Sequence, residues 1–243
     1  MPSSIPGYEY DIFISYRQKD NLYDSWVTEF ILNLRKELEA TFKEDIYIYT
    51  DENKYDGLQE VHHVDESLSS KLKCLIFIPI ISQTYGDPNS YAWKNELLIF
   101  NERASKDRFG LKIKLPNGNV TSRIVPVQIH DLDPQDMSFI ENAIGGPLRS
   151  INFIFKAPGV NRPLRANEDH PHDNQDKTYY RDQINKVANL IKEIILSLKS
   201  PDRETYSATT EHDKVSTSSK FSKQSKRIVL STLVVVTLAL LIY

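Results

Sequence analysis

The sequence has few of the residues that mark disulfide-bonded or nucleic-acid-binding proteins. Its only cysteine is Cys74, so no disulfide can form within the chain. Cys74 lies inside an apolar run, where a buried structural thiol is expected rather than a reactive one. The formal net charge is −3 with both signs interspersed, which leaves no basic field to hold DNA or RNA. These features are consistent with a reducing, cytoplasmic environment.

The sequence also lacks the short motifs of common cofactor and metal sites. It has no GxGxxG, no GxxxxGKS or GxxxxGKT, and no CxxC. The sequence therefore does not support a Rossmann-type dinucleotide-binding motif, a P-loop or a cysteine zinc site. The pairs His62 with His63 and His170 with His172 have no carboxylate or third histidine at ligand spacing, so neither a metal nor a cofactor is predicted. Residues 1–10 lack a charged segment followed by an apolar stretch, so no signal peptide is predicted.

The sequence does contain the alternating strand and helix patterns of an α/β domain. Residues 74–81, CLIFIPII, form a near-continuous apolar run, which is typical of a central parallel strand buried on both faces. Four further strands are predicted at residues 8–16, 45–50, 124–129 and 150–155. Apolar residues at three-to-four spacing predict helices over residues 25–42, about 61–72, 93–106 and 179–198. An inserted hairpin is predicted over residues 109–123, and a long surface loop over residues 157–177.

These elements suit one core of about 150–200 residues, with appendages. Five strands alternating with helices predict a flavodoxin-like, doubly wound parallel sheet. Pro126 predicts that the fourth strand lies near an edge. If the strand order is 2-1-3-4-5, the first and third strands flank the switch point where ligands bind. Residues 15–21 and 82–91, which follow these two strands, are then expected to converge and form a site.

The C-terminal region is predicted to connect the domain to a membrane. Residues 200–227 are rich in Ser, Thr and Lys and read as a flexible basic linker. Residues 228–243 are uncharged and apolar; as a helix they would cover about 24 Å of a hydrocarbon core of about 30 Å. Lys226 and Arg227 can snorkel, and their positive charge predicts that residues 1–227 are cytoplasmic. The apolar run is expected to be either a tail anchor or part of a longer protein.

Four segments in this order resemble a TIR (Toll/interleukin-1 receptor) domain of the bacterial type. They are YDIFISYR at residues 10–17, the polar loop at residues 51–57, the apolar strand that begins at Cys74, and SYAWKNEL at residues 90–97. The resemblance covers residues 8–199 and leaves residues 1–7 as a tail. It departs from the family pattern at Ala92, which occupies the usual tryptophan position, and at Trp93, which falls where cysteine is common.

The resemblance implies two activities: self-association through TIR–TIR contacts, and cleavage of the nicotinamide–ribose bond of NAD+. Nicotinamide leaves as a neutral molecule from a cationic pyridinium, so no general acid is needed and one carboxylate can suffice. The resemblance assigns this catalytic role to Glu96, which would stabilise the oxocarbenium-like charge on the ribose. From position alone, Glu96 could instead be a surface acid that favours a helix N-terminus.

Further residues are assigned to substrate binding by their place on the loops of the expected site. They are Ser15, Tyr16, Arg17, Lys19, Asp51 and Trp93. Arg17 and Lys19 could hold the pyrophosphate or could be solvated loop charges. Trp93 could stack on a ring of NAD+ or pack in the core.

A non-enzymatic function is the main alternative. The chain would then be an adaptor that recruits other TIR proteins through an interaction loop formed by Asp51, Lys54, Tyr55, Asp56 and Gly57, a loop that could equally be a mobile lid. A third reading, a soluble nucleotide-binding response domain, is weaker because the first strand does not end in paired acids.

Overall fold

The computed structural model describes residues 3–50, 68, 70–168 and 178–200. Its main sheet has five strands in the order β2-β1-β3-β6-β7, and every neighbouring pair is parallel. The strands are β1 (Tyr10–Ser15), β2 (Ile48–Tyr49), β3 (Cys74–Ile81), β6 (Val127–Gln128) and β7 (Ile151–Asn152). Numbered along the sheet, this is the order 2-1-3-4-5, which confirms the flavodoxin-like prediction. β6 lies beside the edge strand β7, as the proline suggested.

The central position of β3 follows from its composition. All eight of its residues are buried, and it pairs with β1 from Tyr10 opposite Cys74 to Ser15 opposite Pro79. Because the strands are parallel, β1 and β3 end at the same edge of the sheet. The Cys74 thiol is buried without a disulfide partner, and burial raises its pKa to about 12, which agrees with a structural role.

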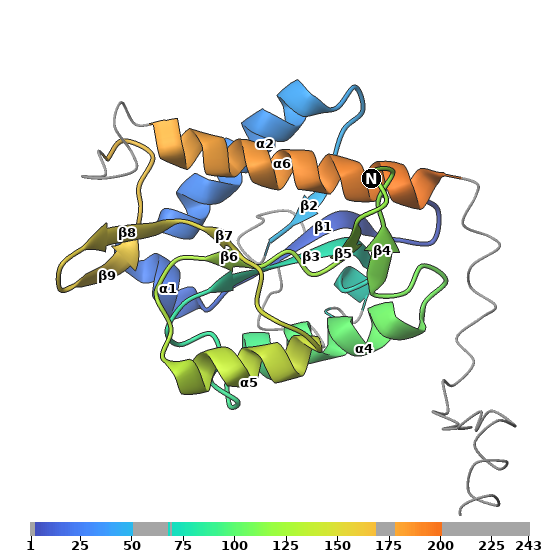
Figure 1. Ribbon diagram of the computed structural model, residues 1–243. Helices are drawn as coiled ribbons and strands as arrows, with labels where there is room; N and C mark the ends of the chain where they lie inside the picture. Colours follow the sequence, from blue (N-terminus) through green and yellow to red (C-terminus); the bar gives the residue numbers. More distant parts are fainter. Residues whose placement is uncertain (1–2, 51–67, 69, 169–177, 201–243) are drawn as a thin grey trace, which may run out of the picture. The chain divides into compact units, whose positions relative to one another are not determined.

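Helices cover both faces of the sheet (Figure 1). α2 (Trp26–Thr41) and α6 (Thr178–Lys199) bury their apolar sides on one face, against Ile12 and Ile14. The other face is covered by η1 (Ala92–Leu97), α4 (Leu98–Lys106) and α5 (Pro134–Ile144), against Phe13. Successive residues of β1 thus belong to opposite cores, as the period of a strand requires. The helices predicted over residues 25–42, 93–106 and 179–198 are all present.

Four local features differ from the sequence prediction. Part of the loop after β1 forms a short helix, α1 (Gln18–Leu22), which was not predicted. The helix α5 was not predicted either. The strand expected at residues 150–155 is split, because Phe153 turns into the core between β7 and β8 (Ile154–Ala157). Part of the expected surface loop is a strand, β9 (Val160–Pro163), which pairs antiparallel with β8. Gly159, with φ of 72°, permits the tight turn between them.

The remaining predicted elements agree in part. The inserted hairpin is present as β4 (Lys112–Lys114) and β5 (Val120–Ser122), paired antiparallel. The second strand is shorter than residues 45–50, because only Ile48–Tyr49 pair with β1. The helix predicted at residues 61–72 and the interaction loop at residues 51–57 lie largely or wholly outside the described residues.

The predicted N-terminal tail is largely described by the structure, whereas the predicted linker and apolar run are not. Ser3 and Ser4, in the predicted N-terminal tail, donate hydrogen bonds from their hydroxyls to Asp11 Oδ1 at 2.7 and 2.8 Å. The linker beyond Ser200 and the apolar run at 228–243 lie outside the described residues. Within the part of the chain that the structure describes, no helix is both long and apolar enough to cross a bilayer.

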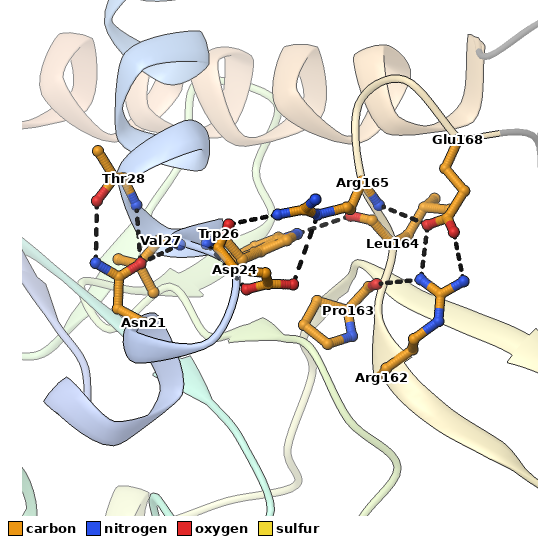
Figure 2. A network of polar contacts seen from close by, with 10 residues as sticks. All are labelled: Asn21, Asp24, Trp26, Val27, Thr28, Arg162, Pro163, Leu164, Arg165 and Glu168. Carbon is orange, nitrogen blue, oxygen red and sulfur yellow. Dashed lines mark hydrogen bonds and ion pairs between the residues drawn. The ribbon is translucent and has the colours of Figure 1, made fainter.

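A polar network fixes the start of α2 beside the segment after β9 (Figure 2). Ser25, just before α2, has φ of 53° and makes no side-chain capping bond. Asn21 caps the helix instead, because its Oδ1 accepts hydrogen bonds from the Val27 and Thr28 amides at 2.9 and 3.3 Å. Arg165 ion-pairs with Asp24 at 3.5 Å. The loop after β1 is therefore fixed at its C-terminal end by the contacts of Asn21 and Asp24.

Candidate active site

The loops that follow β1 and β3 meet at the carboxyl edge of the sheet, as predicted. Arg17 Nη1 donates to Thr84 O at 2.7 Å and to Asp87 Oδ2 at 3.2 Å. Ser82 Oγ, directly after β3, donates to Asp20 Oδ2 at 2.5 Å, and Thr84 Oγ1 donates to Asp20 Oδ1 at 3.3 Å. Side chains from both loops therefore bind one another across the switch point between the first and third strands.

Glu96 lies at this edge, with 9% of its surface exposed. Its Oε2 accepts a hydrogen bond of 2.5 Å from Ser15 Oγ, at the end of β1. In this bond the Ser15 hydroxyl is the donor and the Glu96 carboxylate is the acceptor. The Glu96 carboxylate is therefore directed toward the end of β1.

Ser15 also contacts Tyr85, whose hydroxyl lies 2.8 Å from Ser15 Oγ. Burial raises the pKa of Tyr85 well above its ordinary value of 10, and the nearby charge of Glu96 raises it further, so the phenol keeps its proton. The single Ser15 proton is directed to Glu96. Tyr85 must therefore donate to Ser15, and the three groups form one directed relay from phenol to serine to carboxylate.

A wide helical turn sets the position of Glu96. η1 has π-helical geometry, in which the Leu98 amide bonds to Trp93 O, five residues earlier. The turn buries Ala92, Trp93, Glu96 and Leu97 together. An ordinary α-helix was predicted here. In an α-helix the residues at 92, 93, 96 and 97 also share a face, but the π turn adds a residue and so changes the angle at which Glu96 meets β1.

Trp93, predicted to bind substrate or to pack in the core, has 3% of its surface exposed. Its ring stacks on Phe139 of α5, with centroids 4.8 Å apart, and meets the edge of Tyr85 at 6.5 Å. Its backbone amide is capped by Ser90 Oγ at 3.2 Å. Trp93 thus packs in the core between η1 and α5.

The other predicted substrate-binding residues lie in different environments. Tyr16 is 8% exposed and belongs to the core on the α2 and α6 face. The Arg17 side chain is 17% exposed and forms an ion pair with Asp87 at 3.2 Å. Lys19 is exposed on α1. Asp51, with the rest of the interaction loop, lies outside the described residues.

His130 adds a group that sequence reasoning did not assign to the site. It follows β6 at the same edge of the sheet, and its Nδ1 is buried with no hydrogen-bond partner. Burial lowers its pKa below 6.5, against the opposing charges of Asp20 and Asp24. The imidazole is therefore neutral at pH 7.

Tyr85 and Asp20 were also missed as site residues. The signal for Tyr85 was an aromatic residue within a polar, turn-rich segment that directly follows the central strand. Asp20 was visible only as one charge among several in the first loop. For metals, no cluster of three or more His, Cys, Asp or Glu side chains occurs in the described part of the chain.

Comparisons with known proteins identify no family for this chain. No family model matches it, and no curated protein does. Among solved structures, it is similar to the TIR domains in the structure of the activated Roq1 resistosome directly recognizing the pathogen effector XopQ. The two chains share 17% identity, with 74% of this chain and 84% of that chain covered and a TM-score of 0.35. A likeness this distant says nothing about activity, so the fold assignment rests on the strand order and on the helices that cover both faces.

Proposed function

We propose that this protein is a TIR-type NAD+ hydrolase that works in signalling or defence and is activated by self-association. The observation that supports this proposal is the position of Glu96. Its carboxylate is almost fully buried at the carboxyl ends of β1 and β3 and is fixed by the hydroxyl of Ser15. A negative charge that is already oriented requires little reorganisation when positive charge develops nearby, which is the main source of electrostatic catalysis.

Cleavage of the nicotinamide–ribose bond requires one oriented carboxylate and no general acid. The bond between the ribose C1′ and the nicotinamide nitrogen breaks, and its electron pair leaves with neutral nicotinamide. Positive charge develops on the ribose, and the Glu96 carboxylate stabilises it and orients the sugar through the ribose hydroxyls. Water then adds to C1′ and loses a proton, so the products are ADP-ribose, nicotinamide and one proton.

In this proposal Arg17 binds the pyrophosphate of NAD+. Both of its hydrogen bonds to the loop after β3 are made by Nη1. Nε and Nη2 can therefore donate to phosphate oxygens while the Asp87 pair keeps the side chain in place. Lys19, exposed on α1, contributes positive charge at the same loop.

The reaction class is tested by product analysis. The full-length chain is incubated with NAD+ at high protein concentration, and the products are separated by liquid chromatography. Equal amounts of nicotinamide and ADP-ribose support the proposal. Intact NAD+ after incubation of a demonstrably self-associated sample would reject it.

The second candidate is a non-enzymatic TIR adaptor. It is favoured by Phe139, whose ring stacks on Trp93 yet remains 40% exposed, and by Met137 on the same helix, which is 37% exposed. Exposed apolar side chains of this size suit a protein contact. The adaptor reading predicts that recruitment of a second TIR protein is lost when Tyr55 or Gly57 is altered, survives Glu96→Gln, and consumes no NAD+.

The proposal includes attachment to a membrane by residues 228–243, with the domain in the cytoplasm. A charge at the centre of a membrane helix costs about 2.5–3.5 kcal/mol on insertion scales. Val235→Arg is therefore expected to shift the full-length protein from the membrane fraction to the soluble fraction. Finding the unmodified protein entirely in the soluble fraction would reject the attachment.

A further inference from the structure

Tyr85 lies in the turn that follows β3, and the proposed reaction gives it no role. Its side chain is fully buried. Its backbone amide donates to Ser82 O at 3.2 Å, which closes the turn. Its ring packs against the ring of Trp93 in η1, with centroids 6.5 Å apart and an angle of 72° between the ring planes. Contacts on two elements therefore hold the ring, and one of these elements also carries Glu96.

The hydroxyl of Tyr85 bonds to one group among the described residues. Its oxygen lies 2.8 Å from Ser15 Oγ, at the end of β1. Tyr85 is 0% exposed and Ser15 is 1% exposed, so the two hydroxyls meet each other rather than bulk water. Because a buried phenol that keeps its proton needs a hydrogen-bond acceptor, Tyr85 donates and Ser15 accepts.

This bond restricts the direction of the Ser15 hydroxyl. A serine hydroxyl has one proton and two lone pairs. When Tyr85 donates to one lone pair, the Ser15 proton is directed away from the phenol, and it bonds to Glu96 Oε2 at 2.5 Å. Without the phenol, the hydroxyl is free to rotate about its Cβ–Oγ bond and to point its proton to other acceptors. The carboxylate of Glu96 would then lose this donor for part of the time.

We propose that Tyr85 is a positioning residue that acts only through Ser15: it commits the single Ser15 proton to Glu96 and so keeps the carboxylate in one orientation. Tyr85 itself does not touch the substrate, because its side chain is fully buried. The effect on catalysis rests on the proposed NAD+ reaction, in which supporting groups must hold a catalytic side chain to within about 0.5 Å. The effect on Glu96 itself does not depend on that reaction.

The kinetic test is a double-variant cycle on nicotinamide release from NAD+ by the full-length protein. The variants are Ser15→Ala, Tyr85→Phe and the two combined, assayed at equal degrees of self-association. The matched control is Tyr180→Phe, which removes the hydroxyl of another buried tyrosine, on the face of the sheet covered by α2 and α6. Circular dichroism and a thermal unfolding curve verify that each variant is folded.

Tyr85→Phe is expected to lower kcat about 2- to 10-fold with KM unchanged, which is the size of one neutral hydrogen bond. Ser15→Ala is expected to lower kcat about 10- to 100-fold, because a hydrogen bond to a charged group is stronger. With alanine at position 15, adding Tyr85→Phe should change kcat by less than about twofold. Tyr180→Phe should leave kcat unchanged. Equal losses from Tyr85→Phe in both backgrounds would overturn the proposal.

A second measurement separates this inference from the proposed function. The carboxyl carbons of glutamate are labelled with carbon-13, and the Glu96 resonance is assigned as the one that disappears in Glu96→Gln. Because Tyr85→Phe keeps the aromatic ring, a shift of this resonance reports the change in hydrogen bonding. The shift is expected in the unmodified background, and it should be absent when position 15 is alanine and absent for Tyr180→Phe.

The two measurements fail in different ways. No nicotinamide release by the unmodified, self-associated protein would reject the proposed function, while the carbon-13 resonance would still decide whether Tyr85 positions Glu96. A Glu96 resonance that Tyr85→Phe moves equally in both backgrounds, or in neither, would show that Tyr85 does not act through Ser15.

Discussion

The relay from Tyr85 through Ser15 to Glu96 leads to a prediction about stability in which a second mutation partly repairs the first. Ser15→Ala removes a hydrogen bond to a carboxylate, worth about 1.5–3 kcal/mol, and leaves the buried Tyr85 hydroxyl without its acceptor, which costs about 1–3 kcal/mol more. Together these give a loss of about 2.5–6 kcal/mol. Tyr85→Phe removes only one neutral hydrogen bond and is expected to cost about 0.5–1.5 kcal/mol.

The double variant separates the two contributions. With alanine at position 15, the Tyr85 hydroxyl is a buried donor without a partner, so replacing tyrosine by phenylalanine removes that penalty. Tyr85→Phe is therefore expected to destabilise the unmodified protein but to stabilise the Ser15→Ala variant by about 1–2 kcal/mol. Such a reversal of sign requires Tyr85 to donate to Ser15.

The measurement is urea unfolding, followed by tryptophan fluorescence. The chain has two tryptophans, Trp26 and Trp93, and both are buried, so unfolding changes the environment of each. Ser105→Ala, which removes an exposed hydroxyl from α4, is the control and should change stability by less than about 0.5 kcal/mol. If Tyr85→Phe lowers stability equally in both backgrounds, the relay is wrong.

Three further predictions concern other contacts. Arg123→Met should cost about 3–5 kcal/mol of unfolding free energy, because the buried carbonyls of Cys74 and Leu75 lose the Arg123 donor and Asp107 loses its ion-pair partner. Lys106→Ala, which removes an exposed ion pair with Glu102, should cost under about 0.5 kcal/mol. Asn21→Ala should lower stability by about 1 kcal/mol through loss of the α2 cap; no change in a urea titration would contradict the capping role. Burial lowers the pKa of His130, so the folded state binds fewer protons than the unfolded state, and stability should fall as pH drops below about 6.5. His130→Gln should flatten the stability profile between pH 7.5 and 5.5, and an unchanged slope would remove His130 as its cause.

The strand order was predictable because the apolar pattern of β3 has few interpretations. Eight apolar residues in a row fit only a strand buried on both faces or a helix segment, and the turn residues after Ile81 favour the strand. Once that strand is central, the loops after β1 and β3 must converge, as the contact between Arg17 and Thr84 confirms. The position of Glu96 at this edge follows from the same reasoning.

Other features depend on contacts that are distant in the sequence. The π-helical geometry of η1 was not visible, because the pattern of apolar residues around Trp93 also fits an α-helix. The signals for α5 were present but weak: Asp133 and Pro134 at its start and Gly145 at its end. None of the four residues of β9 is buried, so its sequence shows no apolar strand pattern. It is a strand because β8 pairs with it.

The most direct test of the account is the rate of nicotinamide release from NAD+ by the Glu96→Gln variant. Gln keeps the size of the side chain and removes the charge, while Glu102→Gln makes the same change at an exposed position six residues further along the same continuous helix. The account predicts a loss of about 10²–10³ in kcat for Glu96→Gln and none for Glu102→Gln. Equal rates for the unmodified protein and Glu96→Gln, with both proteins folded and self-associated to the same extent, would contradict it.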